Sequence, residues 1–164
     1  MNRLRIVLVH PRIAANVGNV ARTCLSLGAE LHLVGPFGFI VDPKRLDRTS
    51  VGYWESLRPE VYADFRDFWA RFPRCLKTQF VFAEKDGVHL YSDLSYNTDC
   101  VLIFGNEEEG VADEFWKVES LPMISSCRIP MREIRCLNLA TSVGIVSYEV
   151  NRQWSGRNIE CGAV

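Results

Sequence analysis

Short, strongly apolar runs that alternate with helix-like segments are the feature that most limits what this chain can fold into. Each run is too short for a buried helix and is rich in residues that favour strands. The expected strands cover residues 5–9, 30–34, 78–83 and 100–104, with a shorter one at 127–129. Strands that alternate with helices predict an α/β fold, with a mostly parallel sheet and helices on both faces. Ligands of such sheets bind beyond the carboxyl ends of the strands, so the loops there are the candidate site.

The segments between these strands carry helix signals. A helix is expected over residues 19–27, because Gly28 is a common helix stop. Aromatic residues at helical spacing predict an amphipathic helix that contains Phe65, Phe68, Trp69 and Phe72. A short helix at 112–116 and a long closing helix over 137–154 are also expected, whereas residues 42–58 are polar and broken. No linker, repeat or low-complexity segment divides the chain, so we expect a single domain over residues 1–164.

The closing helix carries two stripes of different character. The first is aliphatic and is expected to face the core: Leu139, Val143, Val146 and Val150. The second, on the roughly opposite face, consists of Thr141, Ile145, Tyr148 and Arg152. A surface helix normally has one apolar stripe, so the second stripe indicates contact with another subunit, although an ordinary mixed surface would give the same pattern.

Composition excludes several classes of protein. Apolar residues make up 48% and charged residues 24%, as in ordinary globular proteins. The net charge of −1 argues against a simple basic nucleic-acid-binding module. No apolar run approaches the roughly 20 residues of a membrane span, and the apolar stretch at residues 6–9 is too short for a secretion signal. We therefore expect a cytoplasmic protein that does not contact a membrane.

Cysteine and histidine usage gives no sign of a metal site. The six cysteines form no CxxC pair, and a chain of this length needs no disulfides, so reduced and mostly buried thiols are expected. The three histidines are isolated from other ligand residues, so no metal is expected.

Two groups of basic residues could still gather at an RNA, although composition alone favours a solvated surface for both. They are Arg3, Arg5, Arg12 and Arg22, and then Lys44, Arg45 and Arg48.

Three segments carry candidate chemistry, and the first covers residues 16–23. Asn16 and Asn19 precede the expected helix, where asparagine is a favoured N-cap. Arg22 would then lie one turn into the helix, near the positive end of its dipole, where a phosphate could bind. A capped helix with an exposed arginine is the alternative.

The second and third segments each follow an expected strand. In the second, Gly105 lets a ligand approach the backbone and Glu107 begins an acidic run, but a tight turn would also explain them. In the third, Ile129-Pro130-Met131 leads through a loop to Leu137 and Asn138, which begin the closing helix. These two loops could form the walls of one pocket. The phosphate-loop, GxGxxG and GxSxG motifs are absent, which disfavours the corresponding nucleotide sites and hydrolases.

In this order and at these separations, the three segments resemble the SPOUT superfamily of knotted methyltransferases. Within it they resemble the SpoU branch, and most closely the short TrmL (YibK) type. The resemblance spans residues 5–153. It implies an enzyme that transfers a methyl group from S-adenosylmethionine to the ribose 2′-hydroxyl of the wobble nucleotide, a cytidine or modified uridine, in leucine tRNAs. It also implies an α/β fold with a deep C-terminal trefoil knot, and a homodimer whose interface includes the closing helix.

The resemblance assigns roles to particular residues of this chain. The residues matched to cofactor-binding positions are Ala83, Gly105, Ile129, Met131, Cys136, Leu137 and Asn138. The residues matched to catalytic positions are Asn16, Arg22, Glu107 and Tyr148. By this resemblance, Arg22 acts against the cofactor of the partner subunit. The sequence departs from the family pattern at Cys136, where serine is usual and a stronger hydrogen bond would form. It also departs at Asn106 and Val111, and the loop over residues 132–135 is one residue shorter.

Methyl transfer requires alignment of the hydroxyl with the methyl group and help in activating the hydroxyl. A guanidinium normally stays protonated, so we expect Arg22 to hold the target phosphate and stabilise the developing alkoxide rather than act as a base. Three alternatives remain open: the same reaction on another tRNA position or on rRNA, a non-catalytic module that binds cofactor or RNA, and a generic α/β protein with chance motif matches.

Overall fold

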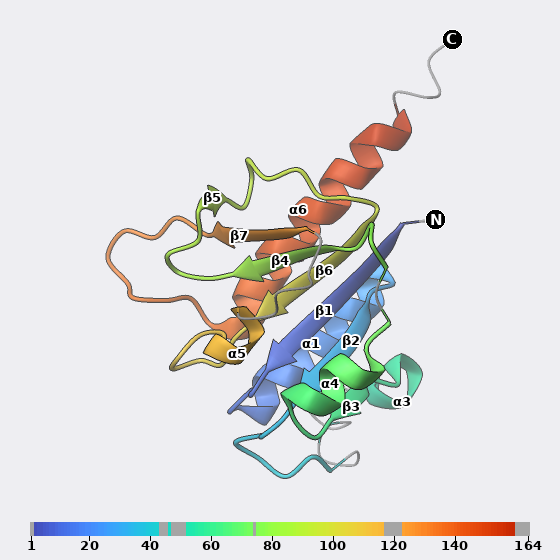
Figure 1. The fold of residues 1–164 in the computed structure, drawn as a ribbon, viewed down its shortest axis with the longest axis vertical. Coiled ribbons are helices and arrows are strands. Elements are labelled where there is room, and N and C mark those ends of the chain that lie inside the picture. The colour runs from blue at the N-terminus through green and yellow to red at the C-terminus, as the bar shows by residue number, and fades with distance from the viewer. Residues whose placement is uncertain (1, 43–45, 47–51, 74, 117–122, 160–164) are drawn as a thin grey trace.

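The computed structural model describes residues 2–42, 46, 52–73, 75–116 and 123–159. Within these residues the strands form a single seven-stranded sheet in the order β3-β2-β1-β6-β4-β7-β5 (Figure 1). They are β1 (Arg3–Val9), β2 (Glu30–Val34), β3 (Glu60–Tyr62), β4 (Gln79–Ala83), β5 (His89–Leu90), β6 (Asp99–Phe104) and β7 (Ile124–Arg128). Every strand pairing is parallel, which confirms the predicted parallel sheet.

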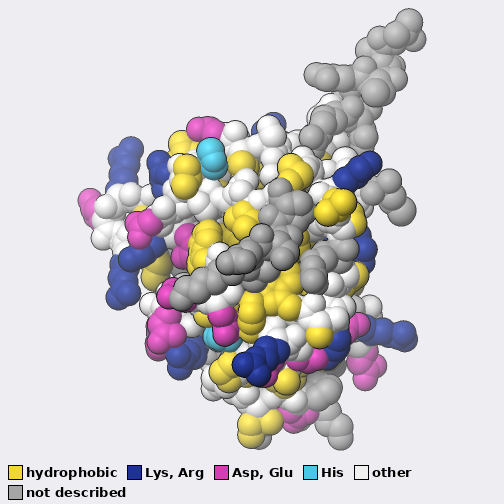
Figure 2. Space-filling view, viewed as in Figure 1, with side chains coloured by type: hydrophobic (Ala, Val, Ile, Leu, Met, Phe, Trp, Pro, Cys, Tyr) yellow, Lys and Arg dark blue, Asp and Glu magenta, His cyan; other side chains and the backbone are white. Residues whose placement is uncertain are grey.

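Helices cover both faces of the sheet, as predicted. On one face lie α1 (Ala14–Leu27) and α6 (Leu139–Ile159), which pack against each other, with the short α3 (Trp54–Leu57) beside α1. On the other face lie α4 (Phe65–Arg71) and α5 (Asp113–Trp116) (Figure 1). Figure 2 shows hydrophobic side chains gathered over the middle of this second face, with charged side chains around it.

The sheet separates two hydrophobic clusters, which explains why its central strands are apolar along their whole length. In β1, Ile6 and Leu8 belong to the cluster beneath α1 and α6, whereas Val7 and Val9 belong to the cluster beneath α4 and α5. Because successive strand residues point to opposite faces, burial of both faces requires apolar residues at every position.

Several predicted boundaries were wrong. The first helix begins at Ala14 rather than at residue 19, and its N-cap Ile13 makes no side-chain capping bond, so neither Asn16 nor Asn19 caps it. The short edge strands β3 and β5 were not predicted, and β7 begins at Ile124 rather than at residue 127. The closing helix begins at Leu139, two residues later than expected.

The two stripes of the closing helix have different surroundings. Leu139, Val143, Val146 and Val150 are buried against the sheet, as predicted. On the other stripe, Tyr148 is 52% exposed, and Thr141 and Arg152 are exposed as well. Ile145 is half-buried, so this stripe is uncovered in a single copy of the chain except at that position.

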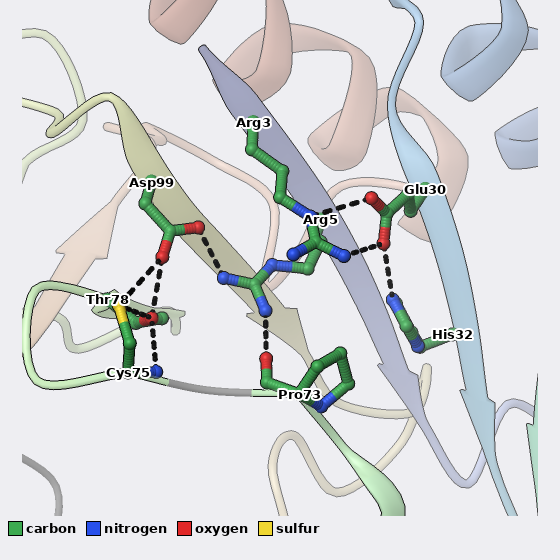
Figure 3. Close-up of polar contacts among 8 residues, drawn as sticks. All are labelled: Arg3, Arg5, Glu30, His32, Pro73, Cys75, Thr78 and Asp99. Atoms are coloured by element: carbon green, nitrogen blue, oxygen red, sulfur yellow. Dashed lines mark hydrogen bonds and ion pairs between the residues drawn. The ribbon is translucent and has the colours of Figure 1, made fainter. Parts of the chain in front are cut away.

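Two of the four arginines near the start of the chain, Arg3 and Arg5, are paired with carboxylates of neighbouring strands, whereas Arg12 and Arg22 are exposed. Arg5 is only 1% exposed and donates to the carboxylate of Asp99 and to the carbonyl of Pro73 (Figure 3). Asp99 also accepts a 2.6 Å hydrogen bond from the Thr78 hydroxyl. Arg3 pairs with Glu30 across β1 and β2 at 2.7 Å. The second basic group, Lys44, Arg45 and Arg48, lies outside the described residues.

Removal of one partner of the Arg5–Asp99 pair should destabilise the protein. Replacing Arg5 with Ala leaves the Asp99 carboxylate without its cationic partner, so we expect the free energy of unfolding to fall by about 2–4 kcal/mol. Burial opposes the charge on Asp99, but the Thr78 hydrogen bond and Arg5 together hold its pKa below the ordinary value. The stabilisation is therefore full above about pH 4 and is lost as pH falls through the lowered pKa.

Urea denaturation at pH 7 and at acid pH measures both effects. The matched control is Arg3→Ala, which removes an exposed ion pair and should change stability by less than about 1 kcal/mol. Equal losses in the two variants would contradict the assignment.

Candidate active site

A pocket lies at the carboxyl edge of the sheet, where β4, β6 and β7 end. These three strands are neighbours, so the loops that leave them meet at this edge. Seven residues predicted from the sequence line the pocket: Ala83, Gly105, Glu107, Ile129, Met131, Cys136 and Leu137. Further lining residues that the sequence reasoning did not single out include Glu84, Lys85, Arg135 and Ser142. The structure therefore brings the second and third segments together, as predicted.

A chain of hydrogen bonds joins all three segments beside this pocket. The Asn138 side-chain amide donates to the Asn16 oxygen at 2.9 Å, and the Asn16 amide donates to Glu107 at 2.7 Å. The other oxygen of Glu107 accepts the backbone N–H of Arg12 at 2.9 Å. Asn16 is 4% exposed, so its amide links the segments from within the protein instead of capping α1.

Asn138 has a second role at the start of α6. Its side-chain oxygen accepts the backbone N–H groups of Ala140 and Thr141, at 2.9 and 3.3 Å. It is therefore the N-cap of the closing helix, and the first residue of that helix is Leu139, directly after Asn138.

The loop that follows β6 leaves no room for a side chain at Gly105. A Cβ at this position would lie 1.8 Å from the carbonyl carbon of Gly110. Asn106 and Gly110 exchange backbone hydrogen bonds of 3.2 and 3.3 Å, and the Asn106 side chain accepts the N–H groups of Glu108 and Glu109. The tight turn, which was the alternative explanation for this glycine, is what the structure contains.

Acidic groups dominate one wall of the pocket. Glu107, Glu108 and Glu109 come from the loop after β6, and acidic side chains are gathered near this loop in Figure 2. Glu84, directly after β4, accepts the backbone N–H of Val111 at 2.7 Å. Burial raises the pKa of the Glu84 carboxyl above its ordinary value, and the Val111 hydrogen bond offsets part of that rise. The sequence signal for Glu84 was its position at a strand end, beside the predicted Ala83.

Arg22 and Tyr148 lie away from this pocket. They line a separate hollow on the outer faces of α1 and α6, together with Asn19, Thr23, Leu25, Ser26 and Tyr53. The Tyr148 and Ser26 hydroxyls are 3.1 Å apart. Because α1 begins at Ala14, Arg22 lies about two turns into the helix, so its predicted place near the positive helix end was wrong.

Free thiols, but no cluster of metal ligands, are present among the residues that the structure describes. Across the described ranges, no group of three or more His, Cys, Asp or Glu residues could hold a metal ion. Cys24, Cys100 and Cys127 are buried free thiols, whereas Cys75 and Cys136 are exposed; Cys161 lies outside the described residues. No helix in the described part of the chain is both long and apolar enough to cross a bilayer.

Comparison with known proteins defines the class. Residues 3–148 match the SpoU rRNA Methylase family. The tRNA (cytidine(34)-2'-O)-methyltransferase of Escherichia coli is 37% identical over 152 residues, covering 92% of this chain and 93% of that protein. The chain therefore belongs to the SpoU methylase family.

Solved structures agree with this membership. One, described as giving structural insights into the 2-OH methylation of C/U34 on tRNA, superposes with a TM-score of 0.83 at 33% identity, covering 94% of this chain and 98% of that one. The SpoU methyltransferase AviRb from Streptomyces viridochromogenes, in complex with the cofactor AdoMet, has a TM-score of 0.78 at 26% identity, covering 93% of this chain and 58% of that one. The fold is thus that of the SPOUT methyltransferases, and the family uses S-adenosylmethionine.

Replacing Gly105 with Ala should distort the wall of the pocket that the loop after β6 forms. The new Cβ would overlap the Gly110 backbone, so the loop must move. We expect affinity for S-adenosylmethionine, measured by calorimetry, to fall by roughly a hundredfold or more, comparable to the loss of about two hydrogen bonds to the ligand. Gly156→Ala is the control: a Cβ at this exposed position in α6 meets nothing within 4 Å, so binding should not change. Wild-type affinity in the Gly105 variant would show that this loop does not shape the binding site.

Proposed function

We propose that this chain transfers a methyl group from S-adenosylmethionine to the ribose 2′-hydroxyl of tRNA, at nucleotide 34 of the anticodon. The observation that carries the proposal is the meeting of the second and third family segments at one pocket, to which Asn16 of the first segment is joined through hydrogen bonds with Glu107 and Asn138. The relative from Escherichia coli, similar over nearly its whole length, supports the choice of tRNA and of nucleotide.

The residues of the pocket fit the proposed cofactor. Ile129, Met131 and Leu137 offer apolar surface for a flat adenine ring, and Glu107 offers a carboxylate for hydroxyl or ammonium groups. When bound, S-adenosylmethionine supplies an electrophilic methyl group on a sulfonium sulfur. We assign Ala83, Gly105, Ile129, Met131, Cys136, Leu137 and Asn138 to holding it.

The catalytic task left to the protein is to position the RNA hydroxyl and to stabilise charge on its oxygen. Arg22 is exposed on α1, so its guanidinium can hold the neighbouring phosphate and stabilise negative charge on the 2′-oxygen. Asn16 and Glu107 act with it by fixing the start of α1 against the pocket wall.

A second copy of the chain completes the site in this proposal. Arg22 and Tyr148 do not line the cofactor pocket of their own chain; they line the separate hollow on α1 and α6. They lie on the uncovered stripe of α6 and the adjacent face of α1, so a homodimer formed through these helices would carry Arg22 to the partner's pocket. Tyr148 would line that interface.

Family membership supports three further proposals. The chain is one methyltransferase domain over residues 1–164, it works in the cytoplasm, and its C-terminal part forms a trefoil knot. Contacts of α6 with the segment between β5 and β6 fit such a knot: Gln153 donates to Leu94 at 2.9 Å, and Trp154 donates to Tyr96 at 3.3 Å.

Replacing Arg22 with Ala should separate turnover from cofactor binding. We expect turnover on tRNA to fall by roughly a hundredfold or more, as when one group that stabilises transition-state charge is removed. Affinity for S-adenosylmethionine should stay within about threefold, a difference of less than about 1 kcal/mol. Arg66→Ala, an exposed arginine on α4, is the control and should behave as wild type. Equal losses of turnover and cofactor affinity in the Arg22 variant would count against this role.

The substrate is tested by nucleoside analysis. Mass spectrometry of tRNA from cells that lack the gene should show loss of 2′-O-methylation at nucleotide 34, and the purified protein should methylate bulk tRNA but not rRNA. Methylation of rRNA, or loss at another tRNA position, would change the assigned target. A protein that bound RNA without turnover would instead be a binding module.

A further inference from the structure

Glu84 connects the strand ends that surround the pocket. It directly follows β4, and its backbone N–H donates to the carbonyl of Cys127 in β7 at 2.9 Å. Its side chain reaches the other way, where Oε1 accepts the backbone N–H of Val111 at 2.7 Å. Val111 is the residue that ends the loop after β6. One residue thus joins β4 to both of its neighbours at the edge where the pocket lies.

Gly110 allows the Glu84 carboxylate to lie directly against this loop. Gly110 has φ of 81°, a left-handed conformation that favours glycine. A Cβ at this position would also lie 2.9 Å from Oε2 of Glu84. The backbone conformation therefore favours glycine here, and a side chain at this position would displace the Glu84 carboxylate.

Simple packing does not account for a carboxylate at this place. Glu84 is half-buried, and burial disfavours the charged form of its carboxyl group. The compensating contact is the hydrogen bond from Val111, which is stronger because its acceptor is charged. That bond holds the 105–111 loop, which forms the acidic wall of the pocket.

We propose that Glu84 is a positioning residue for the cofactor: its carboxylate holds the 105–111 loop in the arrangement that binds S-adenosylmethionine. This inference rests on the cofactor pocket proposed above. Glu84 need not touch the reacting atoms, because its effect passes through the Val111 N–H to the backbone from Gly105 to Gly110.

Three variants test the role of the hydrogen bond. Glu84→Ala removes the acceptor, and affinity for S-adenosylmethionine in calorimetry should fall roughly tenfold to a hundredfold. Turnover at saturating cofactor should change much less, because the reacting groups are untouched. Glu84→Gln keeps an acceptor oxygen and should recover most of the affinity. Asp86→Ala is the matched control: Asp86 has the same charge, lies in the same loop and does not line the pocket, so affinity should not change.

Specific results would overturn the proposal. They are wild-type affinity in Glu84→Ala, a Gln variant as weak as the Ala variant, or an equal loss in Asp86→Ala. If Glu84→Ala did not fold, as judged by thermal unfolding, Glu84→Asp would replace it, because its shorter side chain draws the carboxylate back from Val111. The Asp variant should lose affinity, and wild-type affinity there would also reject the idea. A wild-type protein that bound no S-adenosylmethionine would count against the proposed function instead.

A double-mutant cycle tests the contact itself. Gly110→Ala should weaken cofactor binding through backbone strain and through collision with Glu84. The collision part disappears in the Glu84→Ala background, so the second substitution should weaken binding by a smaller factor there. Strictly additive effects would contradict a direct contact between the two residues.

Discussion

The placement of β6 between β1 and β4 is the constraint on which the rest of the site depends. Phe104, the last residue of β6, is level with Leu8 in β1 and with Ala83 in β4. The loop that follows β6 therefore emerges between the start of α1 on one side and Glu84 on the other. A shift of this pairing by one residue would exchange the two faces of β6, so Leu102 and Phe104 would trade clusters with Val101 and Ile103 and the packing of both clusters would change. Burial of the sheet thus fixes the geometry of the pocket.

Much of this arrangement could be predicted because it has a local signature. The central strands were identifiable from their continuous apolar runs, since a strand covered on both faces has no polar side. Seven of the residues matched to the family segments line one pocket, because parallel strands deliver their following loops to one edge. The inner stripe of α6 was identifiable from helical periodicity alone.

What could not be predicted depends on partners far away along the chain. Asn16 was expected to cap a helix, a local role, but its amide bonds Glu107 and Asn138, 91 and 122 residues away. Arg5 was considered for RNA contact, but its partner Asp99 is 94 residues distant, and that contact buries it. The strands β3 and β5 are too short to show a pattern, and Glu84 follows its strand with no motif of its own. Local sequence patterns limit the structural roles that a residue can have, and tertiary contacts determine which of these roles it takes.

The separation between paired segments also has a consequence for biosynthesis. The first strand of the chain pairs on one side with β6, so the nascent polypeptide cannot complete its central sheet until more than half of it has left the ribosome. The hydrogen bond from Asn138 to Asn16, which joins the last helix to the first, can form only later in synthesis. High contact order of this kind slows folding. The early apolar strands are therefore unpaired on that side during translation, and unpaired apolar strands are prone to aggregation.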